Sequence, residues 1–461
     1  MYATHTSLDY QQNRFNSYRA NNDSYSFFNL LTSDALLDKV EELLPKHRER
    51  QYPPTETLSM FLAQTMNTDR SCQNIVNQVA IQRLTGGLPV NSTYTGGYCR
   101  ARKRLPLNMI SSLTQYLGNL IDQQAPQSWR WQGRPVRIID GTTVTMPDTQ
   151  VNQSDFPQQG AQKPGLGFPI CRIVGVTCLS SGAVLNAAIG KFNGKGGDER
   201  TLLRSIQDTF QAGDVVLGDA LFATYFFIAS MQAKGVDILM EQHGARRKST
   251  DFRCGKRLGE RDHVIVLNKP KIKPDWMSKS DYDIAPKSIT VREFKAGGKI
   301  MITTMLCPKI ASKPELKALY KSRWNVELDI RNIKQTMGMN ILSCKTPDMV
   351  RKEIWVHLLA YNLIRLMMSQ SALIADIAPR NISFKHCLQI WLISSQQMDI
   401  LDDEQLYKLF ILMAQQKVGN RPGRIEPRAV KRRPKAYPLL TKPRDESRES
   451  IRRYGHPKKL K

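Results

Sequence analysis

The stretch KPELKALYKSRWNVELDIRNIKQTM, residues 313–337, has the hydrophobic pattern of a helix. Its apolar residues recur at spacings of three, four and seven and form one stripe: Leu319, Val326, Ile330, Ile333 and Met337. At about 100° per residue, four polar residues share another face within roughly 60°. These four are Tyr320, Arg323, Glu327 and Lys334. One face is therefore expected to pack into a core, while the other presents an acid, two cations and a phenol to a partner.

A carboxylate set among cations on one ridge suits a metal-dependent phosphodiester site. Glu327 can bind a divalent ion, while Arg323 and Lys334 can bind the phosphates on which that ion acts. An ordinary solvated helix face has the same composition. The spacing alone leaves both interpretations open.

The string YKSRWNVELDIRNIK, residues 320–334, resembles the Y-(2)-R-(3)-E-(6)-K signature of DDE transposases of the insertion-sequence-four family. Tyr320, Arg323, Glu327 and Lys334 fill all of its positions. Asp140, at the end of the apolar run RPVRIID, is similar to the first acid of that family. Asp219, in GDVVLGDALF, is similar to the second. The resemblance covers residues 134–337, and two strand-terminal aspartates in the right order make it specific.

The resemblance implies an α/β fold with a ribonuclease-H-like core. It also implies that Asp140, Asp219 and Glu327 are the catalytic residues and hold two Mg²⁺ ions, for which Mn²⁺ can substitute. The expected activity is cleavage at transposon ends and transfer of the 3′-OH into target DNA. The expected partners are double-stranded DNA, as terminal inverted repeats and as target, and a second copy of the chain in the DNA complex.

Family members that cut through a hairpin intermediate flip a base, and several place a Trp about twenty residues before the signature Tyr. The corresponding stretch here is GGKIMITTML, which offers only Ile300 and Met301 as a possible apolar wedge. Trp276 lies further upstream. Trp324 stands about 40° from Tyr320 on the helical wheel and could stack on a base or belong to the core.

The composition favours a nucleic-acid partner. The 461 residues carry a formal net charge of +26, and the sequence pI is about 9.8.

The N-terminus has no signal-peptide pattern. Residues 353–370 are strongly apolar, but they include Glu353, His357 and Arg365. We therefore expect a core helix there, no membrane partner and a cytoplasmic location. The family resemblance implies a bacterial protein associated with the nucleoid. No C-x-x-C pair or zinc-type histidine spacing occurs.

The pattern of the chain predicts a ribonuclease-H-like core with a β-rich insertion, an N-terminal helical domain, and C-terminal helices followed by a basic tail. The core is expected to contain three antiparallel strands and then a helix, a strand, a helix and a strand. RPVRIID and TTVTM are predicted to be separate strands. Before the core we expect a polar lead-in over residues 1–30 and a helical DNA-end-binding domain over 31–125. The two parts of the core are expected over 130–241 and 313–370, with the insertion between them over 242–312. After the core we expect C-terminal helices over 371–420 that could dimerise, and a disordered tail over 421–461 with 15 basic and 4 acidic residues.

A basic cluster precedes one of the N-terminal helices and consists of Arg100, Arg102, Lys103 and Arg104. We expect it to bind DNA ends, although a solvated helix entry is an equal alternative. Three other aspartates, Asp148, Asp155 and Asp198, are interpreted as turn residues or helix caps.

Three rival functions remain: an inactive DNA-binding relative, a structure-specific nuclease, and a basic membrane-surface protein. The last lacks any amphipathic basic helix.

Overall fold

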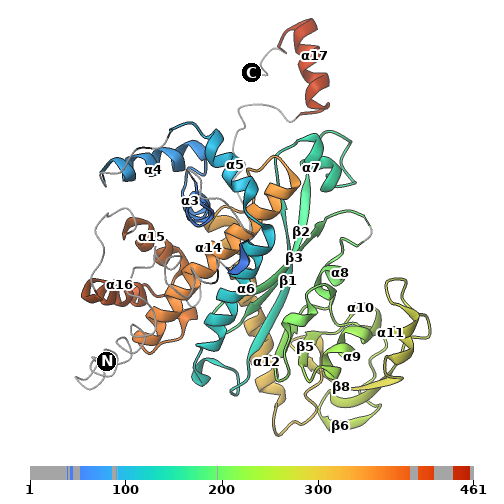
Figure 1. Cartoon of the computed structure of the whole chain (residues 1–461). Helices are drawn as coiled ribbons and strands as arrows, with labels where there is room; N and C mark the ends of the chain where they lie inside the picture. Colours follow the sequence, from blue (N-terminus) through green and yellow to red (C-terminus); the bar gives the residue numbers. More distant parts are fainter. Residues whose placement is uncertain are drawn as a thin grey trace.

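The computed structural model describes residues 39, 42–44, 52–85, 90, 92–194, 196–394, 403–419 and 440–456. The predicted lead-in over residues 1–30 lies outside them, and so do residues 421–439 and 457–461 of the basic tail. The described residues form an α/β fold in which helices pack on both faces of one large mixed sheet (Figure 1).

The sheet has the strand order β3-β2-β1-β4-β5-β9-β8-β7-β6 within the described residues. Its strands are β1 (Val136–Thr145), β2 (Ile170–Cys178), β3 (Val184–Lys191), β4 (Val215–Gly218), β5 (Asp237–Glu241), β6 (Lys256–Gly259), β7 (Asp262–Asn268), β8 (Ser288–Ala296) and β9 (Lys299–Thr303). Strands β1, β4 and β5 are parallel, and every other pairing is antiparallel. Three antiparallel strands followed by two parallel ones are the predicted order of the ribonuclease-H-like core.

Strand β1 corrects one prediction, because the runs RPVRIID and TTVTM form one continuous strand rather than two. Its partner β2 pairs with it along its length, from Arg137 opposite Cys178 to Thr145 opposite Ile170. Gly141 interrupts the apolar pattern but not this ladder of hydrogen bonds. Asp140 therefore lies inside β1, and only the pairing with β4 stops before it.

The two faces of β1 belong to different layers of the core. Ile138 is buried in a cluster with Leu316 and Val326, which come from the region of the signature helix. Ile139 points the other way and packs with the residues of the helices that follow β3 and β4. Because side chains alternate along a strand, Asp140 shares the face of Ile138, and position 141 shares the face of Ile139.

The helices fall into three groups along the chain. The N-terminal group is α3 (Pro54–Met66), α4 (Cys72–Thr85), α5 (Gly96–Arg104) and α6 (Leu107–Gln123). Between the strands lie α7 (Gln150–Asp155), α8 (Glu199–Arg204), α9 (Tyr225–Ala233), α10 (Gly244–Arg247) and α11 (Lys279–Ile284). After the sheet come α12 (Lys313–Lys321), α13 (Asn325–Arg331), α14 (Pro347–Ile374), α15 (Phe384–Ser394), α16 (Asp403–Gln415) and α17 (Arg444–Tyr454).

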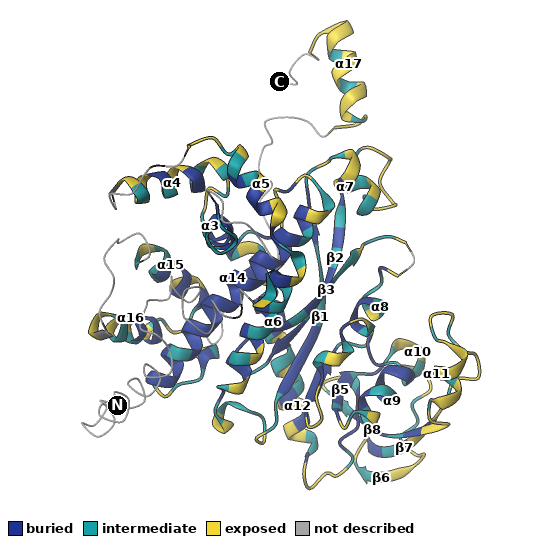
Figure 2. Ribbon diagram, viewed as in Figure 1, coloured by how far each residue is buried: buried dark blue, intermediate teal, exposed yellow. Residues whose placement is uncertain are grey.

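Helix α14 is the centre of the largest hydrophobic cluster, as Figure 2 shows by its almost continuous dark blue. It packs against α3, α6 and α16, so the N-terminal helices share a core with the sheet. Glu353, His357 and Arg365 are all buried along it, and the prediction of a core helix is confirmed. No helix in the described part of the chain is long and apolar enough to cross a membrane.

The segment between β5 and α12 is rich in strands, but it does not form a second sheet. Strands β6 to β9 continue the main sheet beyond β5, at the lower right of Figure 1. Polar contacts to two buried acids, Asp262 and Glu293, hold this extension together. Arg292 on β8 binds Asp262 on β7 at 2.7 Å, and Glu293 binds Arg246 at 2.8 Å and His263 at 3.2 Å.

The tail differs from the prediction of disorder over residues 444–454, which form helix α17. No side chain of this helix is buried. Ion pairs within the helix join Arg448 to Asp445 and Arg453 to Glu449 at 3.0 and 3.1 Å. The few acids of the tail are thus placed at the three- and four-residue spacings that support an isolated helix, which net composition does not reveal.

Candidate active site

The helix predicted over residues 313–337 is divided into four pieces. Helix α12 ends at Lys321, a 3₁₀ turn covers residues 322–324, α13 follows, and a π-helical segment covers residues 332–336. Ser312 and Glu315 form a capping box that fixes the start of α12. The tighter and wider turns change the rotation per residue, so the helical wheel with a constant angle is only approximate here.

Asp140 lies on β1 just beyond the last residue paired with β4. Its side chain is 20% exposed and accepts a hydrogen bond of 2.8 Å from the backbone N–H of Gly141. The residue opposite it on β2 is Gly175, and the space into which a side chain there would point is empty. Asp140 therefore borders open space on its own face of the sheet, because residues directly opposite in an antiparallel pair share a face.

Asp219 follows β4 directly, at the same edge of the sheet. Its carboxylate accepts a 2.8 Å hydrogen bond from the N–H of Leu221, which shapes the turn before α9. Strands β1 and β4 run in parallel, with Ile138 opposite Leu217 as their last pair, so Asp140 and Asp219 each lie two residues beyond the point where the pairing stops. The two aspartates predicted from the sequence therefore lie near each other.

Glu327 reaches this edge from α13, and Arg323 lies between it and the first acid. The Arg323 guanidinium is 3.2 Å from the Glu327 carboxylate and 3.6 Å from that of Asp140. Burial raises the pKa of Asp140, and the nearby negative charges of Asp219 and Glu327 raise it further. The hydrogen bond from Gly141 and the positive charge of Arg323 act in the opposite direction and lower it. Both of the other predicted acids thus act electrostatically on Asp140.

The acids fit a divalent metal ion by chemistry rather than by a preformed geometry. No group of three or more His, Cys, Asp or Glu residues in the described part of the chain is arranged to hold an ion. Arg323 instead supplies the positive charge between Asp140 and Glu327. Carboxylate oxygens are nevertheless the ligands that hard divalent cations prefer, and crowded, partly buried acids gain most from such a charge.

The other signature residues surround the acids. The Lys334 ammonium donates to the Thr142 hydroxyl at 3.1 Å and to the Thr143 carbonyl at 2.7 Å, two and three residues beyond Asp140 on β1. Burial lowers the pKa of Lys334 and raises that of Tyr320. Trp324, in the 3₁₀ turn, is 55% exposed, so its ring is not part of the core.

The basic cluster predicted to bind DNA requires a correction at one position. Arg100, Lys103 and Arg104 are exposed on α5. Arg102 is 8% exposed, and its guanidinium lies over the rings of Phe61 and Tyr98, 4.8 and 5.0 Å from their centroids. It also donates to Gln64 at 3.2 Å. Arg102 therefore stabilises the packing of α5 on α3 and is not available to DNA.

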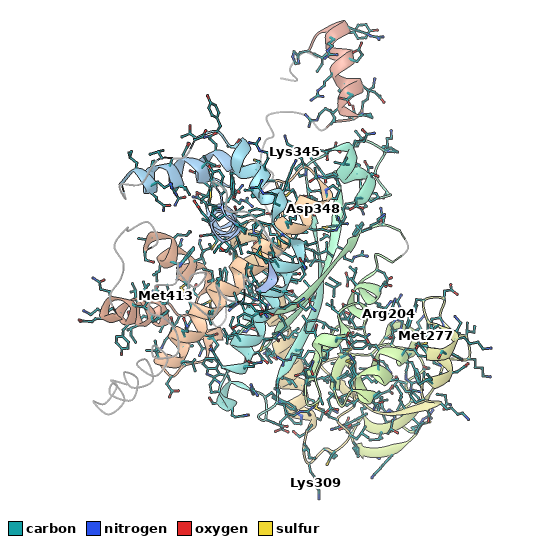
Figure 3. The ribbon with its side chains drawn as sticks, viewed as in Figure 1. Arg204, Met277, Lys309, Lys345, Asp348 and Met413 are labelled. Carbon is teal, nitrogen blue, oxygen red and sulfur yellow. The ribbon has the colours of Figure 1, made fainter. Side chains whose placement is uncertain are left out.

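The apolar wedge requires a similar correction. Met301 is 1% exposed in the cluster that contains Phe294 and Leu239, so its side chain does not reach the surface. Ile300 is half-buried beside it on β9. Trp276 is 49% exposed in the loop before α11, where the Arg204 guanidinium lies 3.9 Å from its ring centroid. Figure 3 places Arg204 and Met277, the residue after Trp276, next to each other.

The aspartates interpreted as structural have structural partners. Asp198 caps α8 by accepting from Thr201, and Asp155 binds Arg351 at 2.6 Å. Asp148 accepts from Gln153 at 2.8 Å. The acid that the sequence analysis missed is Glu199, the neighbour of the cap, which interacts electrostatically with both Asp219 and Asp140. Its position at the start of the helix that follows the third strand of the core was the only available signal.

A ribonuclease-H-like sheet with carboxylates gathered where the pairing of β1 with β4 stops defines a metal-dependent phosphodiester enzyme. A family model described as "Transposase DDE domain" matches residues 131–363. The transposase InsG for insertion sequence element IS4, from Escherichia coli (strain K12), is 26% identical over 412 residues, which cover 86% of this chain and 89% of that protein. The chain therefore belongs to the DDE transposases of the insertion-sequence-four family. It is a DNA transposase, an enzyme that cleaves DNA and transfers strands with divalent metal ions.

Proposed function

We propose that Asp140, Asp219 and Glu327 are the catalytic acids and together hold two Mg²⁺ ions, or Mn²⁺ in their place. The observation that carries this proposal is their convergence from three elements on one edge of the sheet, with Arg323 as the cation between two of them. When bound, the ions activate the attacking water or 3′-hydroxyl and stabilise the departing oxygen.

The cations and the phenol of the signature bind the DNA backbone. Arg323 can donate two parallel hydrogen bonds to a phosphate, and Lys334 adds a point charge. Lys334 is held beside Asp140 through Thr142 and Thr143, so a phosphate that it binds lies near the acids. Tyr320 offers a hydroxyl, and the exposed ring of Trp324 offers a stacking surface for a base.

The substrates are the terminal inverted repeats of a bacterial mobile element and a double-stranded target, joined in concert by a homodimer. The net charge of +26 supports strong DNA binding and hence association with the nucleoid in the cytoplasm. Arg100, Lys103 and Arg104 on the exposed side of α5 support end binding by the helical unit over residues 31–125. Residues 371–420 are the proposed dimerisation segment.

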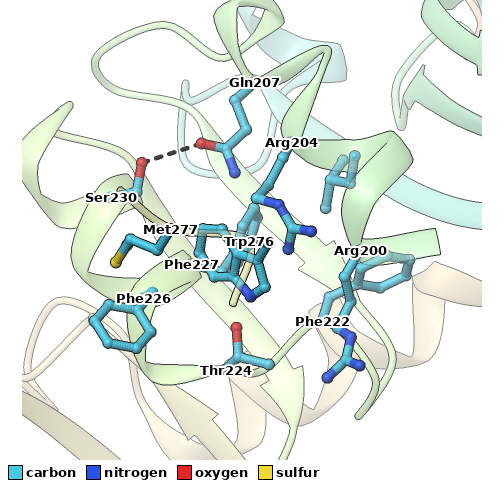
Figure 4. Close-up of a pocket in the computed structure, with 11 residues that line it drawn as sticks. Arg200, Arg204, Gln207, Phe222, Thr224, Phe226, Phe227, Ser230, Trp276 and Met277 are labelled. Atoms are coloured by element: carbon cyan, nitrogen blue, oxygen red, sulfur yellow. Dashed lines mark hydrogen bonds between the residues drawn. The ribbon is translucent and has the colours of Figure 1, made fainter. Parts of the chain in front are cut away.

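Cleavage proceeds through a hairpin, which requires one base to leave the helix. A pocket of ≈ 120 Å³ between α8, α9 and the loop before α11 supports this step (Figure 4). Its lining includes Trp276 and three phenylalanines, Phe222, Phe226 and Phe227, together with Arg200 and Arg204. Aromatic rings can stack on an unpaired base, and guanidinium groups can bind its phosphate. This pocket replaces Ile300 and Met301 as the proposed base site.

The test is Mg²⁺-dependent cleavage of a labelled duplex that carries the flanking ends of the element. Native chain, Glu327→Gln and the matched surface control Glu404→Gln are compared, because Glu404 is 77% exposed on α16. We expect Glu327→Gln to lose on the order of 10³-fold in cleavage rate, while DNA binding persists and the control cleaves normally. Full cleavage by Glu327→Gln would overturn the assignment. If the native chain cleaves the duplex but does not join it to target DNA, the result would favour a structure-specific nuclease. If the native chain binds the duplex without cleaving it, the result would favour an inactive DNA-binding relative.

A further inference from the structure

Glu199, the first residue of α8, lies directly against Gly141 of β1. A Cβ atom at position 141 would lie 2.4 Å from the carboxyl carbon of Glu199 and 2.6 and 2.7 Å from its oxygens. No other residue fits at this position while Glu199 is in place. Gly141 directly follows Asp140, so Glu199 is held one residue along the strand from a proposed catalytic acid.

The carboxylate of Glu199 has little compensation for its partial burial. Its side chain is 24% exposed, and its nearest cation, Arg172, is 3.7 Å away. Arg172 already donates to the carbonyl of Gly197 at 2.7 Å and stacks on Phe192. None of the described residues donates a hydrogen bond to Glu199. Burial raises the pKa of Glu199, and the negative charges of Asp219 and Asp140 raise it further. The positive charge of Arg172 lowers this pKa and only partly offsets the rise.

The neighbouring acid shows that the loop could have satisfied such a group. Asp198 accepts from the backbone N–H of Thr201 at 3.2 Å and from its hydroxyl at 2.5 Å. Glu199 has no such bonds, and the negative charges of Asp219 and Asp140 act on it. A partly buried carboxylate without donors, next to like charges, is disfavoured unless a cation reaches it.

We propose that Glu199 is a fourth carboxylate of the catalytic centre and helps to hold a divalent ion at the edge where Asp219 lies. It approaches from the α8 face of the sheet, whereas Glu327 approaches from the α13 face. The inference rests on the proposed function of the three acids above. It also explains why glycine follows Asp140, since a side chain at position 141 would exclude Glu199.

The experiment is calorimetric titration of the full chain with Mn²⁺ in the absence of DNA. Glu199→Gln is compared with the native chain and with Asp208→Asn, which removes one negative charge from a fully exposed side chain after α8. Glu327→Gln serves as the reference for the proposed site. We expect Glu199→Gln to weaken Mn²⁺ binding by about 10- to 100-fold, and Asp208→Asn to bind as the native chain does.

A second variant, Gly141→Ala, keeps every acid but displaces Glu199, and it should weaken Mn²⁺ binding as well. Thermal unfolding in EDTA shows whether each variant is folded. Unchanged Mn²⁺ affinity in Glu199→Gln, with weaker binding in Glu327→Gln, would overturn this inference alone and leave Glu199 as a partner of Arg172. Unchanged affinity in both variants would overturn the proposed function of the acids.

Discussion

Two acids of α13 lie two residues apart in opposite surroundings. Glu327 is 37% exposed, and Arg323 is near it at 3.2 Å. Asp329 is fully buried and binds Arg365 and Arg380 at 2.5 and 2.6 Å. Arg365 comes from α14 and Arg380 from the 3₁₀ turn after it, so Asp329 joins α13 to the core. We call these the catalytic face and the anchoring face of α13.

The difference lies in where the neutralising charge comes from. On the anchoring face the protein itself supplies two guanidinium groups, so the acid contributes to stability and cannot bind an external ion. On the catalytic face Glu327 and Asp140 share one cation, Arg323, and the charges of Asp219 and Glu327 both act on Asp140. We expect such a face to lower the stability of the free protein and, as proposed above, to bind cations.

The largest effect is expected from Asp329→Asn. Removing the charge leaves Arg365 and Arg380 without their carboxylate partner, and breaking such a buried pair costs about 3–5 kcal/mol in the free energy of unfolding. Urea denaturation of Glu327→Gln should show a change below about 0.5 kcal/mol, as for other partly exposed positions. Equal stabilities of the two variants would remove the distinction between the faces.

The second effect tests the same principle in the N-terminal helices. Arg102→Gln removes the cation that lies between Phe61 and Tyr98, and it should lower the free energy of unfolding by about 1–3 kcal/mol. The matched control is Arg104→Gln, since Arg104 is exposed on the same helix. A larger loss of stability in the control would contradict the assignment of Arg102 to the core.

The third effect concerns Asp140→Asn, which should raise the free energy of unfolding rather than lower it. The folded-state pKa of Asp140 is raised, chiefly by burial, so its ionisation opposes folding and stability is lost as the pH rises through that pKa. The variant should therefore be more stable than the native chain at neutral pH in EDTA, by about 0.5–2 kcal/mol. The gain should vanish below the ordinary pKa of an aspartate.

With divalent ions present, the native chain should instead be more stable than Asp140→Asn, because the ions bind and stabilise the native chain and bind the variant poorly. Thermal unfolding at several pH values, with EDTA and with Mn²⁺, measures both changes. A variant that is less stable than the native chain in EDTA at neutral pH would show that Asp140 is neutralised internally, as Asp329 is.

The smallest effect is expected from neutralising the exposed cluster on α5. Replacing Arg100, Lys103 and Arg104 together by Gln should weaken DNA binding and reduce its salt dependence, by a slope of about 0.9 for each phosphate that the protein no longer neutralises. A filter-binding assay over a salt series measures the slope, and Arg102→Gln is not included because it would disturb the fold. An unchanged slope would show that the cluster is only a solvated helix surface.

Much of this protein could be predicted from local patterns. The order of strands and helices in the core follows from periodicities of two and 3.6 residues, and α14 is recognisable by its apolar length and internal charges. The three acids could be selected because two end apolar runs and one lies in a specific signature. Local patterns failed for α17, where the order of charges matters more than their sum, and for β1, where pairing with β2 continues the strand through Gly141.

The sequence by itself indicated the class of enzyme, because its signature residues resemble those of a known family, and it indicated the order of strands and helices, because hydrophobic periodicity depends on spacing along the chain. Only the tertiary structure decided which cations are free for DNA, since Arg102 and Arg104 are indistinguishable in a run of basic residues. It also decided that Glu199, rather than Asp198, adjoins the catalytic edge. The reason is physical: burial and electrostatic compensation depend on neighbours in space, and strand β1 brings together residues that are far apart in the chain.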